Sequence, residues 1–293
     1  MSLYPNASFS AIILLDKTAK ICYTICDFQI KDENVLNLRK VCLMNLKCKI
    51  ENFYNYVVDM SKYHTQNIIE ETSKFDGQKS YVLMFHQVEP KLSEKDNEYT
   101  ITILGFMDLI ETLISLEFQF CDVNYFVAEA NGKKILLTFD DAYSGVYTTV
   151  FSFLKGKSIP FVVFQTCDLL DRDGFLSTIM IKKMLQYDKF TLGAHTMSHC
   201  NLHKSLSIEN EIIAPIDFFY NKFGKRPEIF AYPYGAFVTI DTKAIKCVKK
   251  NYKYAFSTCR TYYRSILGEK KYLIPRININ EDNYKLFLKS LIK

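Results

Sequence analysis

The sequence lacks long hydrophobic runs, a basic leader and a strong charge of either sign. Its first apolar run, Ala11 to Leu15, is too short to span a bilayer, and no later run reaches about 18 apolar residues. No basic residue precedes that run, as a secretory signal would require. The 37 Lys and Arg residues only slightly exceed the 32 Asp and Glu residues and are scattered, which disfavours nucleic acid as a partner. We therefore predict a cytoplasmic protein. A peripheral position at the inner membrane surface stays open, because the net charge of +5 slightly favours anionic lipid.

The chain has nine cysteines, but none of them has the spacing of a zinc ribbon. They form an odd set without a C-x-x-C pair, which is typical of buried thiols in a reducing compartment. With 48% apolar and 15% aromatic residues, the chain can bury a sizeable core, which excludes a disordered or collagen-like protein. Its 293 residues allow one large domain or two ordinary ones.

The first 78 residues differ in pattern from the remainder. Two short β-type runs are followed by a helix-leaning stretch with apolar residues on one face, and no chemistry-bearing cluster occurs there. The chain-reversal signal Asp76-Gly77 indicates a soft boundary near residue 78. We therefore predict an N-terminal α+β extension of unknown role over residues 1–78 and a second domain over residues 79–293.

From residue 79 onward, short β-rich runs alternate with stretches of helical period. The predicted strands are Tyr81–Phe85, Phe118–Val123, Ile135–Phe139, Phe161–Phe164, Phe190–Ala194, Ile229–Tyr232, Tyr254–Ser257 and Tyr272–Ile274. The predicted helices are Phe106–Leu116, Tyr147–Lys155, Ser177–Tyr187, Ile208–Phe223, Asp241–Asn251 and Tyr284–Ile292, with Ser207 and Gly224 suited to cap the fourth. Repeated β and α segments predict an α/β fold of seven or eight parallel strands, and that number favours a barrel over an open sheet.

Side chains suited to hydrolysis follow several of these strands. In order along the chain they are His86, Asp140, Asp141, His195, His199, Tyr234 and Arg276. In an α/β barrel the carboxyl ends of the parallel strands meet at one rim, where the connecting loops build the active site. We therefore expect these side chains to gather at that rim.

His195 and His199, with one carboxylate of the Asp140-Asp141 pair, have the composition of a three-ligand metal site. Neutral imidazoles and a carboxylate suit Zn²⁺ or another divalent cation such as Co²⁺ or Ni²⁺, and three ligands leave a position open for water. Such a water needs a base, and adjacent residues of a strand point to opposite faces, so the two carboxylates could have different roles. The alternatives are a solvated helical face for the histidines and a polar loop start for the carboxylates.

Three segments resemble the first three motifs of the polysaccharide deacetylases with a NodB-homology domain, carbohydrate esterase family 4. They are Thr138–Asp141, His195–His199 and Phe230–Gly235, in that order, and the resemblance covers roughly residues 79–280. It implies a distorted (β/α) barrel that removes N- or O-acetyl groups from glycans with a divalent metal, usually zinc.

The resemblance also implies roles for single residues. Asp140 corresponds to the catalytic base, and Asp141, His195 and His199 correspond to the metal ligands. Tyr234 corresponds to the residue whose backbone N–H helps to bind the oxyanion.

The sequence departs from the family pattern around the base. The usual Arg two residues before Pro233 is Ala231 here, so another group must orient Asp140. Arg276, at another predicted strand end, is the candidate, and an ordinary surface or ion-paired arginine is the alternative. Ala142 stands where Gly is common, and Cys200 stands where Pro is common; neither change removes a ligand.

The family's late Leu-x-His motif, which supplies the general acid, is missing, because no histidine follows His203. However, the segment around His86 resembles the branch that deacetylates poly-N-acetylglucosamine, in which the catalytic histidine precedes the Asp-Asp motif. The resemblance thus implies that His86 protonates the departing amine. The alternative is a buried histidine at a strand end.

We therefore predict a metal-dependent hydrolase that removes N-acetyl, or O-acetyl, groups from a sugar in a glycan or glycan precursor. Its partner would be an N-acetylated sugar or oligosaccharide, and a cytoplasmic location favours association with glycan assembly. Two alternatives remain: an amidohydrolase of the same fold that acts on a small non-sugar amide, and a catalytically inactive glycan-binding protein.

Overall fold

The computed structural model describes residues 14–15, 21–22, 75–93, 99–128, 132–236, 239–258 and 269–292. The chain has two compact units, Met1–Asn55 and Tyr56–Lys293, and each is considered by itself. In the first unit, β1 (Leu14–Leu15) pairs antiparallel with β2 (Ile21–Cys22). Most of the predicted N-terminal extension lies outside the described residues, so its α+β character and its boundary near residue 78 stay predictions.

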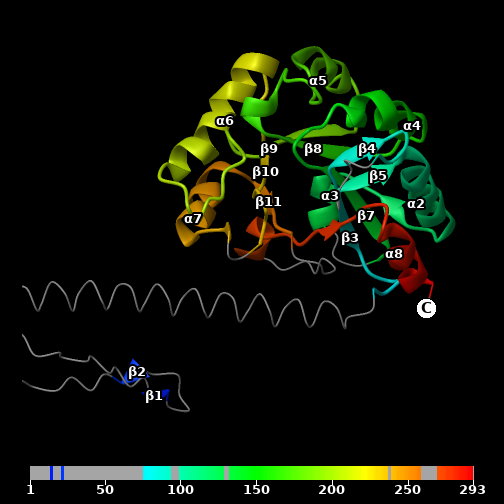
Figure 1. The fold of residues 1–293 in the computed structure, drawn as a ribbon, viewed down its shortest axis with the longest axis horizontal. Coiled ribbons are helices and arrows are strands. Elements are labelled where there is room, and N and C mark those ends of the chain that lie inside the picture. The colour runs from blue at the N-terminus through cyan, green and yellow to red at the C-terminus, as the bar shows by residue number, and fades with distance from the viewer. Residues whose placement is uncertain are drawn as a thin grey trace, which may run out of the picture. The chain divides into compact units, whose positions relative to one another are not determined.

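The second unit is built on a parallel sheet (Figure 1). Seven of its strands follow in the order β11-β10-β9-β8-β7-β3-β12, and β6 pairs with β7 beside this path. Their bounds are β3 Tyr81–Phe85, β6 Gln119–Phe120, β7 Lys134–Phe139, β8 Phe161–Gln165, β9 Phe190–Ala194, β10 Ile229–Ala231, β11 Tyr254–Phe256 and β12 Ile277–Asn278. Every pairing in this sheet is parallel, which confirms the predicted α/β fold with a distorted, curled barrel.

One short segment contacts both ends of the curled sheet. Ile274 forms an isolated parallel bridge with Phe256 of β11, and three residues later β12 pairs with β3. The bridge is held by hydrogen bonds from Ser257 N to Ile274 O (2.8 Å) and from Ile274 N to Ala255 O (2.9 Å). The segment 274–278 is therefore the seam of the barrel.

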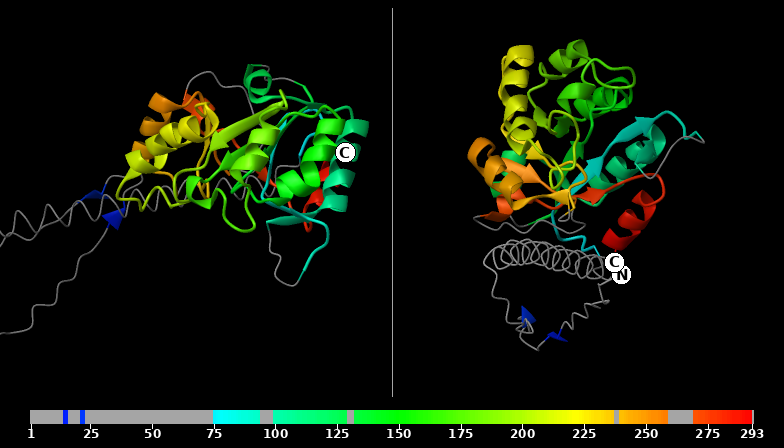
Figure 2. Two further views of the ribbon diagram at one scale, coloured as in Figure 1. Left: turned by 90° about the horizontal axis from the view of Figure 1, so that it is seen from above. Right: turned by 60° about the vertical axis from the view of Figure 1, so that its left-hand side comes forward.

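Helices surround the sheet (Figure 1). They are α2 Ile103–Ser115, α3 Val123–Ala128, α4 Phe151–Gly156, α5 Thr178–Met184, α6 Ile208–Phe223, α7 Thr242–Asn251 and α8 Tyr284–Leu291. Figure 2 shows α6 and α7 beside one end of the sheet and α2 and α8 beside the other. No described helix is long and apolar enough to cross a membrane.

Alternate strand residues pack on the two faces of the sheet, as the two-residue period of a strand requires. Inner residues such as Val82, Leu136 and Phe164 form one buried cluster with α3. Outer residues such as Leu83 and Leu137 pack against α2, α4, α5 and α8 in another. Side chains two and four positions after an inner residue also face inward. His86 lies four positions after Val82, and Asp140 lies four positions after Leu136, so both are directed into the barrel.

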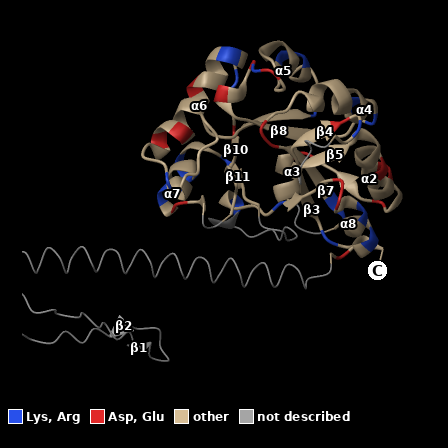
Figure 3. Ribbon diagram, in the orientation of Figure 1, with Lys and Arg blue, Asp and Glu red and all other residues tan. Residues whose placement is uncertain are grey.

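Charged residues of both signs are distributed over the helices. Figure 3 shows Lys and Arg on α4, α7 and α8, and Asp and Glu on α2 and α6. This distribution agrees with the scattered charge of the sequence, while the absence of a nucleic-acid partner stays a prediction.

Several predicted elements differ from the structure. The last predicted strand, Tyr272–Ile274, is wrong: Tyr272 ends the 3₁₀ turn η4 (Glu269–Tyr272), and the strand is β12. Pro275 separates the two, since proline has no N–H to donate to a sheet ladder. The predicted strand 118–123 shrinks to β6, because Val123 begins α3, and the predicted helix 147–155 divides into the π turn η1 (Val146–Val150) and α4.

Other local predictions agree with the structure, and one strand pair was missed. α6 follows its N-cap Ser207 and ends at Gly224, whose φ of 71° lies in the left-handed region that favours glycine. The missed pair is β4 (Gln87–Glu89) with β5 (Thr100–Thr102), a small parallel sheet directly after His86.

Candidate active site

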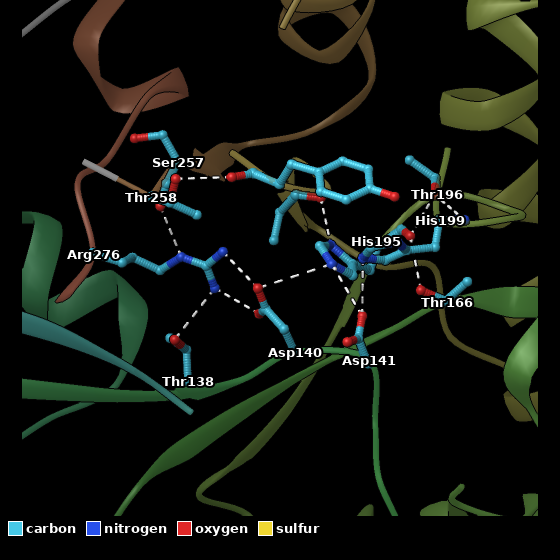
Figure 4. Close-up of polar contacts among 12 residues, drawn as sticks. Thr138, Asp140, Asp141, Thr166, His195, Thr196, His199, Ser257, Thr258 and Arg276 are labelled. Atoms are coloured by element: carbon cyan, nitrogen blue, oxygen red, sulfur yellow. Dashed lines mark hydrogen bonds and ion pairs between the residues drawn. The ribbon is translucent and has the colours of Figure 1, made fainter. Parts of the chain in front are cut away.

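The predicted site residues follow four different strands and the isolated bridge at Ile274. His86 follows β3, Asp140 and Asp141 follow β7, His195 and His199 follow β9, Tyr234 follows β10, and Arg276 follows the Ile274 bridge at the seam. Figure 4 shows Asp140, Asp141, His195, His199 and Arg276 in contact with one another. The structure thus brings residues that are up to 136 positions apart into one polar cluster within the apolar barrel.

Asp140 and Arg276 form a buried, bidentate ion pair (Figure 4). Arg276 Nη1 donates to Asp140 Oδ1 at 2.6 Å and Nη2 donates to Oδ2 at 2.7 Å. The two side chains are 3% and 0% exposed, so solvent does not weaken the pair. Burial opposes ionisation of Asp140 most strongly, but the charges of Arg276 and His195 outweigh it and lower the pKa of this carboxyl. Asp140 is therefore a carboxylate at neutral pH.

The guanidinium of Arg276 is held on every side. Its Nε donates to Ser257 O at 3.0 Å, and Nη1 also lies 3.4 Å from Thr138 Oγ1. The rings of Phe164 and Phe256 lie 5.3 and 6.0 Å from its Cζ atom. Arg276 is thus a buried, ion-paired arginine rather than a surface one, and it reaches the carboxylate that the missing arginine at position 231 would have contacted.

Asp141, His195 and His199 form a cluster with the composition and spacing of metal ligands. Asp141 Oδ1 lies 3.5 Å from His195 Nε2 and 3.1 Å from His199 Nε2, and one ligand atom from each residue lies within 4.8 Å of the others. Ligands about 2.1 Å from a tetrahedral zinc ion would be about 3.4 Å apart. Within the described part of the chain, the buried Asp141 Oδ1 has no hydrogen bond of suitable geometry besides its close contact with His199, as expected of an atom directed at a cation.

The protonation states of His195 and Asp141 also suit a metal. His195 Nδ1 lies 2.8 Å from Ala231 O; because a carbonyl only accepts, Nδ1 is the donor and Nε2 carries the lone pair. Burial lowers the pKa of His195 to about 4, so this imidazole is neutral at pH 7. Burial would raise the pKa of Asp141, but contact with His199 and the charge of His195 lower it to about 2. For His199, contact with Asp141 outweighs burial and raises the pKa above 6.5.

Strained backbone is concentrated in these loops. Five non-glycine residues there have φ in the left-handed region: Asp141 (62°), Ala142 (64°), Thr196 (66°), His199 (58°) and Tyr234 (61°). Each costs about 1–2 kcal/mol, and such strain persists where the surrounding structure imposes it, as at active sites. The value at Ala142 explains why glycine suits this position in the family pattern.

His86 and Tyr234 flank the cluster. Burial lowers the pKa of the half-buried His86, while Asp140 and Asp141 act to raise it, so the imidazole is close to both carboxylates. Its Nδ1 is buried and has no hydrogen-bond partner among the described residues, and its ring lies 4.8 Å from the ring of Tyr99. The ring of Tyr234 lies 5.0 Å from that of His199, and the hydroxyl of Thr258 donates to Tyr234 O at 2.9 Å. The acid and oxyanion roles of His86 and Tyr234 stay predictions.

Sequence reasoning missed the residues that support this cluster. Thr138 contacts Arg276, Thr166 Oγ1 donates to His195 O at 3.1 Å, and Ser257 O accepts from Arg276. Serine and threonine have no distinctive sequence pattern in such roles. Only their position at or directly after the ends of strands could have indicated that they lie near the site.

One family model matches part of the chain. Residues 128–255 match the family model for polysaccharide deacetylase, a range that includes Asp140, Asp141, His195, His199 and Tyr234. His86 and Arg276 lie outside the matched range. No curated protein matches the chain.

Solved structures show the same fold. A polysaccharide deacetylase from Bacillus cereus is 22% identical, with a TM-score of 0.64 over 73% of this chain and 69% of that chain. IcaB from Ammonifex degensii is 20% identical, with a TM-score of 0.63 over 74% of this chain and 99% of that chain. The deacetylase PplD from Streptococcus pyogenes, solved in complex with acetate, is 18% identical, with a TM-score of 0.64 over 73% of this chain and 98% of that chain.

Proposed function

Because residues 128–255 match the family model for polysaccharide deacetylase, we propose that the protein hydrolyses the N-acetyl group of a sugar in a glycan or glycan precursor, with a divalent metal ion as cofactor. The family match supports a carbohydrate deacetylase, and the metal dependence and the sugar amide are our proposals. Zn²⁺ is the ion that two imidazoles and a carboxylate suit best, and Co²⁺ or Ni²⁺ would also fit.

One observation carries the proposal: two adjacent carboxylates have separate partners. Asp140 is paired with a guanidinium and lies 3.9 Å from His195 Nε2, whereas Asp141 faces the two imidazoles. A binding protein would need only the ligand set. A hydrolase also needs a base beside it, because an attacking water must lose a proton.

Asp141, His195 and His199 would hold the metal. When bound, the ion would polarise the acetyl carbonyl and make a water more acidic. Asp140 would take the proton from the attacking water, and Arg276 would keep the carboxylate ionised and in a fixed orientation. The lowered pKa of Asp140 ensures that the base is unprotonated at neutral pH.

Two further groups would complete the reaction. The backbone N–H of Tyr234 would donate to the oxyanion, and His86 would protonate the departing amine. Because burial lowers the pKa of His86, its imidazole is neutral at rest at pH 7 and must gain the proton that it donates during the reaction. The carboxylates of Asp140 and Asp141 favour the imidazolium once that proton arrives.

Exposed aromatic rings beside the site suit a sugar substrate. Tyr234 is 56% exposed next to His199, and Tyr99 is 42% exposed next to His86. Such rings offer flat apolar faces with a polar edge. The structurally similar PplD was solved with acetate, which is the product that this reaction would release.

The test is acetate release from short N-acetylhexosamine oligomers by the full chain, with chelator, Zn²⁺ or Co²⁺. We expect metal-dependent acetate that falls by about 10²–10⁴-fold in Asp140→Asn, since that is the usual contribution of a general base. Asp173→Asn, which changes an exposed carboxylate before α5, is the matched control and should keep full activity.

Other results would redirect the assignment. A filled metal site without acetate from any oligomer would contradict the sugar substrate and favour a small amide. Failure to bind a divalent ion would favour a glycan-binding protein. A cytoplasmic location and contact with a membrane or a glycan-assembly complex stay predictions.

A further inference from the structure

The loop between the two histidines of the metal cluster is built around a carboxylate from another element. Glu211, in the first turn of α6, accepts hydrogen bonds through Oε2 from the backbone nitrogens of Met197 (3.1 Å) and Ser198 (3.0 Å). Its Oε1 accepts from Ser198 Oγ at 2.9 Å. Three donors of one short loop therefore converge on one side chain.

The backbone of this loop is shaped to receive an anion. Thr196 has φ of 66°, in the left-handed region, and the next two N–H groups point at the same oxygen. Successive N–H groups in such a turn form a concave nest that binds anions. Glu211 supplies the anion from within the chain, through charge-assisted bonds that are stronger than neutral ones.

The side chain of His195 is anchored outside this loop. His195 directly follows β9, its backbone N donates to Gln165 O at 3.0 Å, and its Nδ1 is anchored on Ala231 O. The side chain is 2% exposed, so packing on all sides fixes it. The first histidine is thus positioned by the sheet.

His199 is held differently. Its side chain is 28% exposed, its φ is 58°, and its backbone N donates to Thr196 Oγ1 at 2.9 Å within the same loop. Met197 and Ser198, the two residues directly before it, are the ones that Glu211 holds. The backbone N–H groups of Cys167 and Asp168 also hold this loop, by donating to Thr196 O (3.2 Å) and Met197 O (2.8 Å). Glu211 is therefore one of the groups that fix the conformation in which this imidazole faces Asp141.

We propose that Glu211 is a positioning residue that sets the metal affinity of the site by holding the 196–198 loop and, through it, His199. The inference rests on the metal site of the proposed function. It does not require that the substrate be a sugar, because its readout is metal binding and not acetate release.

The test compares Glu211→Gln, Glu211→Ala and Glu209→Gln in the full chain. Glu209 is an exposed carboxylate in the same turn of α6, so its variant removes the same charge and serves as the matched control. The dissociation constant for Zn²⁺ is measured by competition with a chromophoric chelator. The visible absorption of Co²⁺-loaded protein reports the ligand geometry.

We expect Glu211→Ala to weaken Zn²⁺ binding about tenfold, the scale of losses at groups that orient metal ligands. Glu211→Gln should lose less Zn²⁺ affinity, because its amide oxygen can still accept one or two of the hydrogen bonds from the loop. The Co²⁺ spectrum should change in the Glu211 variants only, and Glu209→Gln should match the wild type in both measurements.

Affinities of both Glu211 variants within twofold of the wild type would overturn the inference, even if their melting temperatures fell. So would a wild-type chain that binds neither ion. If Glu211→Ala does not fold, Glu211→Gln carries the comparison. A wild type that binds Zn²⁺ but deacetylates no sugar would overturn the proposed substrate and leave the role of Glu211 standing.

Discussion

Replacement of Arg276 by methionine should cost about 3–5 kcal/mol of unfolding free energy at neutral pH, because it leaves a buried carboxylate without its partner. The variant loses two hydrogen bonds of 2.6 and 2.7 Å to Asp140, whose side chain is only 3% exposed. Water cannot replace the guanidinium at such a position without opening the seam. Methionine has a similar length and packs well, so loss of volume contributes little.

The cost should depend on pH in a direction fixed by the pKa of Asp140. In the wild type this pKa lies below the ordinary value of 3.8, so the ionised carboxylate stabilises the fold above pH 3.8 and the gain is lost as pH falls through the lowered pKa. Without Arg276, burial dominates and raises the pKa above 3.8. The variant then loses stability as pH rises toward that raised value, by up to about 1.4 kcal/mol per pH unit.

Urea unfolding of the metal-free chain at pH 5 and pH 8 measures both effects. The difference between wild type and Arg276→Met should be larger at pH 8 than at pH 5. Arg172→Met, at an exposed arginine, controls for the loss of one positive charge. The double variant Arg276→Met with Asp140→Asn removes the buried charge and should recover part of the loss at pH 8.

Two results would refute this reasoning. A loss below about 1 kcal/mol at pH 8 would mean that the ion pair contributes no more than an exposed one. An equal loss at both pH values would mean that packing, rather than the uncompensated charge of Asp140, causes the destabilisation.

Other perturbations test the barrel and the metal cluster. A Cβ added at Gly193 would lie 2.5 Å from the ring of Phe164, so Gly193→Ala should lose about 1–3 kcal/mol in urea unfolding, whereas Gly156→Ala, with open space around its Cβ, should not be destabilised. In the metal-free chain, burial opposes protonation of His199, but Asp141 outweighs it and raises the pKa. The resulting stability is complete below pH 6.5 and is lost as pH rises through the raised pKa. The unfolding free energy of the wild type, measured in the presence of chelator from pH 5.5 to 8.5, should show this loss of stability. The same loss in a His199→Gln variant would contradict its assignment to His199.

Strands with continuous apolar runs could be predicted well. Tyr81–Phe85 has the bounds of β3, because this apolar run is flanked by polar residues and is buried throughout. Phe190–Ala194 also has the bounds of β9, although Thr191 and Leu192 are only partly buried. The polar residues at the ends of such strands then indicate where the candidate site lies. His86 and His195 follow β3 and β9 directly, so the rim of the barrel was visible in the sequence.

Elements fixed by tertiary contacts could not be predicted in the same way. Val123 ends an apolar run that reads as a strand, but it begins α3 because this helix covers the inner face of the sheet. The seam around Pro275 depends on which strands it meets when the sheet curls. Local pattern carries no information about that closure.

The supports of the site escaped prediction for a related reason. The left-handed φ of Thr196 belongs to a β-branched residue that disfavours it, so no propensity indicates it. Glu211 is one acidic residue among several in an amphipathic helix, and nothing in its spacing points to the loop that it holds. Only the packing of α6 beside that loop reveals its contacts.

The position of Arg276 indicates which role it would have in the proposed reaction. It lies between Ile274, which bridges β11, and β12, which pairs with β3, so the guanidinium arrives beside Asp140 as part of the closed barrel. Its three nitrogens are all engaged, Nη1 and Nη2 with Asp140 and Nε with Ser257 O. A guanidinium has only hydrogen-bond donors and no acceptor, so it cannot take the proton of an attacking water. We therefore infer that Arg276 orients and ionises the base, and that proton transfer is left to Asp140 and His86.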